Sequence, residues 1–189
     1  NDFIEVDKMN YEIRRREDDK YAVFDVNGKM ISPDWFDDIL EYGLVEGQSK
    51  YYIAVKDGKE AIFDVNGNMI TKEWFDKIWL DGLVKGESRY YVVYKIVNLF
   101  SPFKYAIFDI NGNQITPEWF NGINSNYGLI KGQSNFYIAE KDGKKAIFDV
   151  NGNRISDWFD EIDTDGLVKG ESNYYIAKRD GRWAIFHKD

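Results

Sequence analysis

The chain has 189 residues, of which 43% are hydrophobic and 31% are charged, a composition typical of a folded globular chain. Its formal net charge of −8 repels phosphate backbones, so we expect no nucleic-acid partner. Cysteine is absent, which excludes disulfides, thiolate metal sites and cysteine nucleophiles. No apolar run approaches the roughly 20 residues that a membrane-spanning helix needs, so we expect no membrane insertion.

The first residue is Asn1 and not Met, as in a mature chain after signal removal or in an excised fragment. The absence of cysteine does not fix the compartment. We therefore expect a secreted or cell-envelope location in preference to a cytoplasmic one.

A seven-residue motif recurs along the chain. Ala22 to Gly28 returns as Ala61 to Gly67, as Ala106 to Gly112 and as Ala146 to Gly152, and a further copy begins at Ala184. A period of about 39 residues predicts a repeat architecture. We expect a single repeat domain over residues 1–189, with four full units and one partial unit. The approximate boundaries are 1–42, 43–81, 82–127, 128–165 and 166–189, the last being partial.

Each regular unit contains an Asp-Gly and an Asn-Gly dipeptide between apolar runs, a strong signal for β-hairpins with type I′ turns. The Asp57-Gly58 turn predicts a register that pairs like with like in several units. In the second unit these pairs are Ala54 with Ala61, Ile53 with Ile62 and Tyr52 with Phe63.

The Asn66-Gly67 turn, interpreted in the same way, opposes Phe63 with Ile70 and completes a three-stranded meander. A Gly-Leu-Val segment that starts each regular unit is a candidate for a short fourth strand. Ser or Thr followed by an acid and Trp, as in Thr71-Lys72-Glu73-Trp74, is typical of a helix start, so we predict a short helical turn in each repeat.

The predicted meander has two apolar faces. Tyr52, Ala54, Ala61 and Phe63 share one face, whereas Ile53 and Ile62 lie on the other. A sheet with two apolar faces must be covered on both sides. We therefore predict an all-β fold whose meanders stack as an open array. A five-bladed β-propeller is the alternative, because units of about forty residues suit blades equally well.

The end of the chain carries a resemblance to a known family. Asp180-Gly181-Arg182-Trp183-Ala184-Ile185-Phe186 resembles the core of the bacterial WG repeat, in which a Gly-Lys-Trp-Gly-Phe-Ile-Asp segment precedes an Asn-Gly turn. The segment Lys144 to Asn153 matches the length and the turn of that repeat, and Trp158 to Ile162 lies where that repeat has its Tyr-Asp segment. The namesake Trp occurs here only as Trp183. The resemblance implies a β-repeat scaffold or binding role, without catalytic residues.

Catalytic chemistry has little support in the sequence. The sole histidine, His187, lies two residues from the end, so no Ser-His-Asp arrangement can be assembled. Asp64 and its counterparts recur in every full unit, which suggests a scaffold role. The segment from Asp64 to Asn68 superficially resembles a Ca²⁺ loop, but a hairpin turn explains the same residues. We expect no enzyme, no cofactor and no metal site.

Two sets of residues are candidates for binding. Four tryptophans recur with the repeat and are expected either to pack against a neighbouring unit or to stack on sugar rings: Trp35, Trp74, Trp119 and Trp158. The second set breaks the repeat symmetry, because the segment between Tyr91 and Ala106 is longer than its counterparts. An extended hairpin there would carry Leu99, Phe100 and Phe103 at its tip, as exposed apolar patches at contact sites do.

These candidates lead to two functional hypotheses. The first is a non-enzymatic repeat scaffold for protein interaction or cell-surface binding, with the extended hairpin as the contact. The alternative is a lectin-like carbohydrate-binding module with one aromatic site per repeat. The expected partner is accordingly a protein or a cell-surface glycan.

Overall fold

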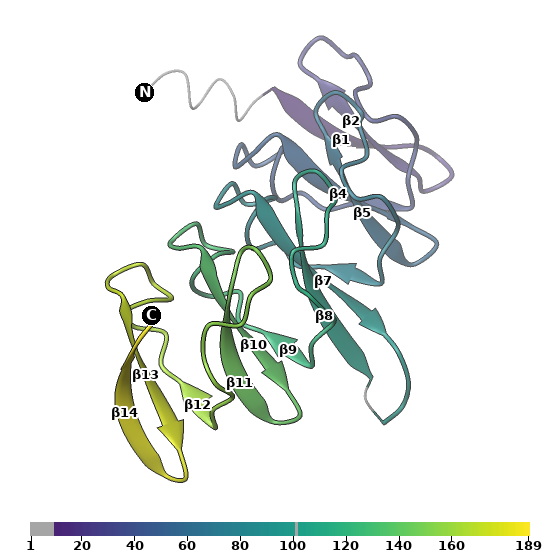
Figure 1. The fold of residues 1–189 in the computed structure, drawn as a ribbon. Helices are drawn as coiled ribbons and strands as arrows, with labels where there is room; N and C mark the ends of the chain where they lie inside the picture. The colour runs from purple at the N-terminus through teal and green to yellow at the C-terminus, as the bar shows by residue number, and fades with distance from the viewer. Residues whose placement is uncertain (1–9, 101) are drawn as a thin grey trace.

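The computed structural model describes residues 10–100 and 102–189, and this part of the chain contains β-strands and turns but no helix. The strands form five small antiparallel sheets (Figure 1). The first sheet pairs β1 (Tyr11–Arg15) with β2 (Tyr21–Asp25). The others are β3 (Asp38–Ile39), β4 (Tyr51–Lys56) and β5 (Lys59–Asp64); β6 (Lys77–Ile78), β7 (Tyr90–Ile96) and β8 (Phe103–Asp109); β9 (Gly122–Ile123), β10 (Phe136–Lys141) and β11 (Lys144–Asp149); and β12 (Glu161–Ile162), β13 (Tyr174–Arg179) and β14 (Arg182–His187).

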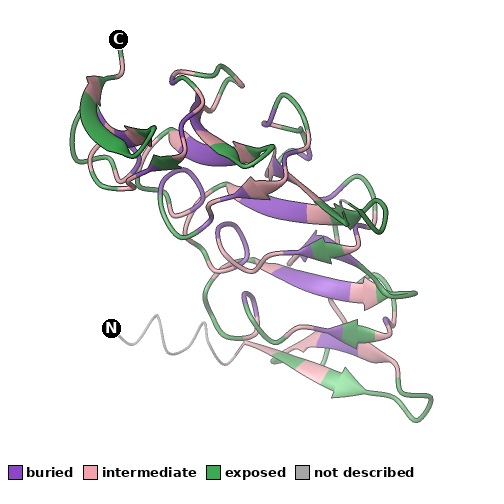
Figure 2. Cartoon of the chain, turned by 90° about the horizontal axis from the view of Figure 1, so that it is seen from below, coloured by how far each residue is buried: buried purple, intermediate pink, exposed green. Residues whose placement is uncertain are grey.

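The five sheets follow one another in chain order as an open stack. The sheet of β1 and β2 lies at one end of the stack, and the sheet of β13 and β14 lies at the other (Figures 1 and 2). The predicted all-β open array is therefore confirmed for the described residues. The alternative of a closed five-bladed ring does not describe this arrangement.

The Asp-Gly hairpins have the predicted turn and register. Asp57 and Gly58 both have positive φ, 52° and 75°, as a type I′ turn requires. Strand β4 pairs with β5 so that Ala54 faces Ala61 and Ile53 faces Ile62, and the same register recurs between β10 and β11 and between β13 and β14. The two-residue loop thus fixes which side chains share a face.

The prediction for the Asn-Gly turns is wrong by one residue. Phe63 opposes Met69 and not Ile70, and only the glycine of the turn, Gly67, has positive φ. The cause is the Asp64 carboxylate, which accepts hydrogen bonds from the backbone N–H groups of both Asn66 and Asn68 at 2.9 Å. This Asx turn favours a three-residue loop, so the Asn does not need the left-handed conformation of a type I′ turn.

The predicted helical turn is also absent. The Thr71 hydroxyl does not cap a helix but accepts a hydrogen bond from the backbone N–H of Ile62 at 3.3 Å, and Ser156 does the same for Ile147 at 2.8 Å. The chain then runs back along β5, where Phe75 and Glu60 exchange backbone hydrogen bonds of 2.7 and 2.8 Å. The segment therefore bends over Thr71–Glu73 and rejoins the edge of the sheet at Phe75, which is bridged to Glu60.

Each three-stranded sheet takes its short strand from the preceding sequence repeat. Ile39, in the first unit, pairs with Ala54, in the second. The Gly-Leu-Val segment, a candidate fourth strand, forms a turn instead. Its glycine is obligatory at this close approach, because a Cβ on Gly82 would lie 2.1 Å from the Tyr90 carbonyl oxygen. Because each three-stranded sheet contains strands from two repeats, backbone hydrogen bonds join successive units.

The core consists of layers between adjacent sheets, and the two apolar faces are covered as predicted. Ile53 and Ile62 of one sheet pack against Tyr91 and Val93 of the next. Figure 2 shows the resulting buried centre of the strands, with exposed residues at the hairpin ends. The corresponding contacts are Val23 with Tyr52, Ala54, Ala61 and Phe63; Val92 and Ile107 with Tyr137, Ala139, Ala146 and Phe148; and Ile138 and Ile147 with Tyr175 and Ala177.

Candidate functional site

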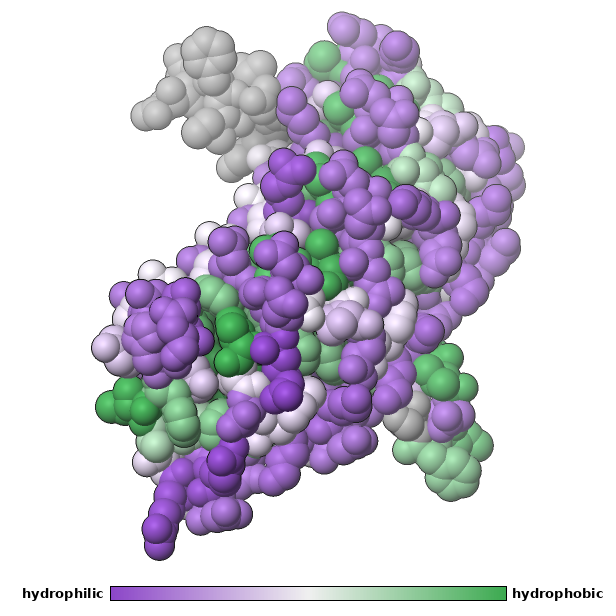
Figure 3. Space-filling model, in the orientation of Figure 1, coloured by the Kyte–Doolittle hydropathy of each residue, from purple (hydrophilic) through white to green (hydrophobic). Residues whose placement is uncertain are grey.

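The β7–β8 hairpin projects from the stack and ends in apolar side chains. Leu99 is 95% exposed and Phe100 is fully exposed, whereas Phe103 is 42% exposed. This exposed apolar surface also includes Ile96, the last residue of β7, and Val97, which follows it. The projecting hydrophobic surface stands apart from the hydrophilic body of the molecule in Figure 3. The three residues predicted for this site therefore lie together; Ser101, between them, is outside the described residues.

The base of this hairpin is fixed by the preceding unit. The Asp76 carboxylate accepts hydrogen bonds from the Lys59 ammonium at 2.7 Å and from the backbone N–H of Ile96 at 2.8 Å. The Lys59 hydrogen bond, followed by the Ile96 bond, lowers the pKa of Asp76. Phe103 contacts Tyr94 edge-on at 5.3 Å between ring centroids. The base of the hairpin is thus bonded to the preceding unit, whereas Leu99 and Phe100 at its tip are exposed.

The repeated tryptophans lie at the edges of the layers between sheets. Trp74 is partly buried and contacts the rings of Phe36 and Phe63, both at 5.9 Å between centroids. Trp119 and Trp158 make the equivalent contacts with the phenylalanines of their own and the preceding unit. Trp35, in the first unit, contacts Phe24 at 5.7 Å.

Cationic side chains also lie over these rings. Arg16 stands 4.8 Å from the ring centroid of Trp35, and Lys95 stands 4.3 Å from that of Trp119. Because phenylalanine rings and cations already contact the indoles, the geometry favours the packing role of the four tryptophans. Their stacking on sugar rings stays a prediction. Lys95 belongs to the extended β7–β8 hairpin. Through this contact Trp119 lies beside the base of that hairpin.

A cavity of about 310 Å³, open to solvent, was not predicted from the sequence. Its polar lining comes from the loop after β9 and from facing residues of β10 and β11, namely Asn124, Asn126, Glu140 and Lys145. Trp79 of the second sequence unit supplies an aromatic wall, and Ile138 and Ile162 supply apolar surface. The sequence does carry a signal for this cavity, because Trp79 and Gly122 differ from the residues at the same positions in the other units. The predictions above rest on residues that recur, so they do not include these two.

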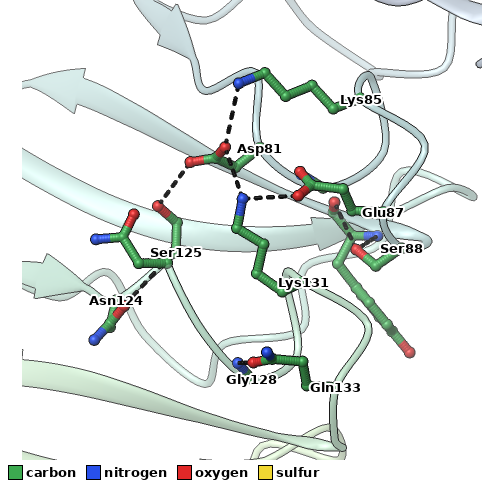
Figure 4. A network of polar contacts seen from close by, with 12 residues as sticks. Asp81, Lys85, Glu87, Ser88, Asn124, Ser125, Gly128, Lys131 and Gln133 are labelled. Carbon is green, nitrogen blue, oxygen red and sulfur yellow. Dashed lines mark hydrogen bonds and ion pairs between the residues drawn. The ribbon is translucent and has the colours of Figure 1, made fainter. Parts of the chain in front are cut away.

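A polar network holds the loop of this cavity in place (Figure 4). The Ser125 hydroxyl donates to the Asp81 carboxylate at 3.3 Å. Lys131 donates to the same carboxylate at 3.2 Å and to Glu87 at 2.7 Å. Hydrogen bonding to Glu87, aided by Asp81, raises the pKa of Lys131. The loop is therefore tied to the turn of the preceding unit.

Residues 10–100 and 102–189 contain no group of three His, Asp or Glu side chains placed to hold a metal ion. The carboxylates of the candidate Ca²⁺ loops bond instead to backbone N–H groups of their own turns, as Asp149 does to Asn151 and Asn153. Within the same ranges, no helix is long and apolar enough to cross a membrane.

Comparison with known proteins adds little. No family model matches the chain, and no curated protein matches it. Among solved structures, the chain is similar to TolB from Acinetobacter baumannii, with 14% identity, a TM-score of 0.37, and coverage of 96% of this chain and 51% of TolB. The chain thus spans about half the length of that protein. A likeness of this degree carries no argument about function.

Proposed function

We propose that the chain is a non-catalytic repeat scaffold, of the kind that the WG-repeat resemblance implies, and that it captures a protein partner through the β7–β8 tip. The observation that carries this proposal is the exposure of Leu99 and Phe100, at 95% and 100%, on a hairpin that projects from the stack. Large apolar side chains exposed in this way are typical of contact sites.

Energetics supports the tip as a binding element. Burying a Leu or Phe side chain completely contributes about 1.5–3 kcal/mol, so two such side chains can act as the hot spot of an interface. The base is held by Asp76, so ordering the hairpin on binding costs little conformational entropy. Lys95 and Lys104 flank the apolar tip. The partner that fits best is a protein with an apolar pocket and an acidic rim.

The test compares affinity capture by the wild type with capture by the double variant Leu99→Asp, Phe100→Asp. The matched control is Val26→Asp, because Val26 is a 69% exposed apolar residue on a turn of the first unit. We expect the wild type and the control to retain the same partner protein. The double variant should bind that partner with an affinity at least a hundredfold lower. Unchanged thermal unfolding of both variants shows that the fold is intact.

Two outcomes would contradict the proposal. If the double variant retained every protein as well as the wild type does, the β7–β8 tip would not be the contact site. Cosedimentation with phosphatidylcholine–phosphatidylglycerol vesicles, lost in the double variant, would show that the tip enters lipid instead. The net charge of −8 opposes the second outcome, because anionic vesicles repel an acidic protein.

A further inference from the structure

Departures from the repeat pattern converge on the cavity beside β9. Gly122 takes the position that a charged residue holds in the other short strands, namely Asp38, Lys77 and Glu161. Trp79 takes the position of Leu40, Asn124 and Asp163. Scaffold positions repeat, whereas a binding site is expected to break the symmetry of the array.

The loop after β9 is a further departure. The segment from Ile123 to Gly128 is one residue longer than the corresponding segments 39–43, 78–82 and 162–166. It places Asn124 and Asn126 in the wall of the cavity, while Ser125 is buried against the Asp81 network (Figure 4). Gly122 and the longer loop that follows it thus meet Trp79, which is more than forty residues earlier in the sequence, at one cavity.

The lining has unused hydrogen-bonding capacity. Within the described ranges, neither the Glu140 carboxylate nor the Lys145 ammonium has an ion-pair or side-chain hydrogen-bond partner, although the two residues face each other across β10 and β11. The Asn124 side-chain oxygen accepts the backbone N–H of Asn126 at 2.9 Å, which leaves its NH₂ group as a donor. The cavity therefore offers an acceptor, donors and no net charge.

The aromatic wall is held firmly. The Trp79 indole contacts Tyr105 at 5.3 Å between ring centroids, and its backbone N–H donates to Val92 at 2.9 Å. An indole face presents negative electrostatic potential to the C–H groups of a ring stacked on it. Combined with apolar surface and a few convergent polar groups, such a wall is typical of a small-molecule site of this volume.

We propose that this cavity is a saccharide-binding site that takes one neutral hexopyranose ring. The apolar face of the sugar stacks on Trp79, and its hydroxyl groups donate to Glu140 and accept from Asn124 and Lys145. The opposite charges of Glu140 and Lys145 select a neutral ring over an anionic ligand. This site is separate from the β7–β8 tip. It also differs from a set of equivalent sites at the repeated tryptophans, because Trp79, Gly122 and the longer loop occur only once in the array.

The repeat itself supplies the test variants. Gly122→Lys introduces the residue that Lys77 provides in the third sheet, and Trp79→Leu introduces the residue that the first unit has as Leu40. Both changes are compatible with the fold elsewhere in the same chain. A Cβ at Gly122 meets Glu140 at 3.3 Å, so the lysine side chain extends into the cavity.

The experiment titrates ¹⁵N-labelled protein with glucose and with N-acetylglucosamine and follows the indole N–H of Trp79 and the amides of Asn124 and Asn126 by NMR. We expect saturable shifts of these signals in the wild type and at least a tenfold weaker affinity in both variants. The Leu99→Asp, Phe100→Asp protein should bind sugar normally, which separates this proposal from the proposed function. Absence of shifts at about 100 mM sugar, or equal shifts in Gly122→Lys, would overturn the proposal.

Discussion

Tyr52, Tyr91 and Tyr137 occupy the same position in successive sheets, and each side chain is fully buried. Their rings stack on the phenylalanine of the paired strand, as Tyr91 does on Phe108 at 6.1 Å between centroids. Their hydroxyl groups have no hydrogen-bond partner among residues 10–100 and 102–189. Desolvation in this position raises the pKa of all three phenols. The aromatic ring of each tyrosine therefore stabilises the layer by packing, whereas its buried hydroxyl group lowers the free energy of unfolding.

Replacing Tyr91 by Phe is expected to raise the free energy of unfolding by about 1 kcal/mol, because it removes a buried polar group that no described residue satisfies. Urea denaturation measures this difference. Tyr175→Phe serves as the control, since its hydroxyl is not among the buried groups without a partner, and it should show no gain. A loss of stability in Tyr91→Phe would mean that its hydroxyl is hydrogen-bonded to an ordered water.

At the scale of the element, an aspartate that recurs in the first, second and fourth units joins each of them to the unit that follows. Asp37 and Asp160 accept the backbone N–H of Asp57 and Asp180, at 2.7 and 3.0 Å, as Asp76 accepts that of Ile96. Each of these carboxylates is also paired with a lysine of its own unit. The lysine hydrogen bond is the main reason that the pKa of each carboxyl is lowered.

A carboxyl whose pKa is lower in the folded state stabilises the protein fully above its unfolded pKa of about 3.9, and this contribution is lost as the pH falls through the folded pKa. We therefore expect stability to fall below about pH 4. In the variant Asp37→Asn, Asp76→Asn, Asp160→Asn, urea unfolding should show lower stability at pH 7 and a smaller loss between pH 7 and pH 3.

Asn121, which accepts the Asp142 N–H at 3.0 Å, shows that an amide keeps the backbone hydrogen bond, so these substitutions remove mainly the ion pairs. The charge-matched control changes to amides three exposed acids that form no ion pair with any described residue: Glu46, Glu73 and Asp142. An equal loss of stability on acidification in both triple variants would show that net charge, and not the lysine pairs, causes it.

The hairpins show how far local sequence determines an element. The Asp57-Gly58 turn was predicted correctly, because type I′ geometry is set by two residues and the strand pairing follows from it. The Asn66-Gly67 turn was misjudged, because the Asp64 side chain competes for the turn amides. The helix-start pattern at Thr71 failed for a tertiary reason, since its hydroxyl bonds across the sheet to Ile62.

The candidate site was predictable only in part. An insertion relative to the repeat identified the tip of the β7–β8 hairpin, because a longer hairpin must project beyond its neighbours. The cavity at Trp79 was missed, because its lining comes from four strands (β9 to β12), the loop after β9 and Trp79, and their contact depends on how the units stack. Comparing each unit with the consensus at every position, and not only at the aromatic ones, would have found Gly122.

At the scale of the whole molecule, the first sheet of the stack differs from the sheets that follow it. Glu12 and Arg14 take the positions that Tyr52 and Ala54 hold in the second sheet, and their ion pair of 2.6 Å lies over Phe24 on the outer face of the first sheet. This face of the first sheet is therefore charged, where the corresponding face of the second sheet is apolar and buried. Between the ends, every sheet depends on its neighbours to cover both apolar faces.

Small-angle X-ray scattering of the monomer tests this open stack most directly. A compact globular chain of this length has a radius of gyration of about 16 Å. The open arrangement in Figure 1 predicts a clearly larger value and a pair-distance distribution with a long tail, because the first and last sheets lie at opposite ends. A value near 16 Å with a symmetric distribution would contradict the account and indicate that the sheets close on one another.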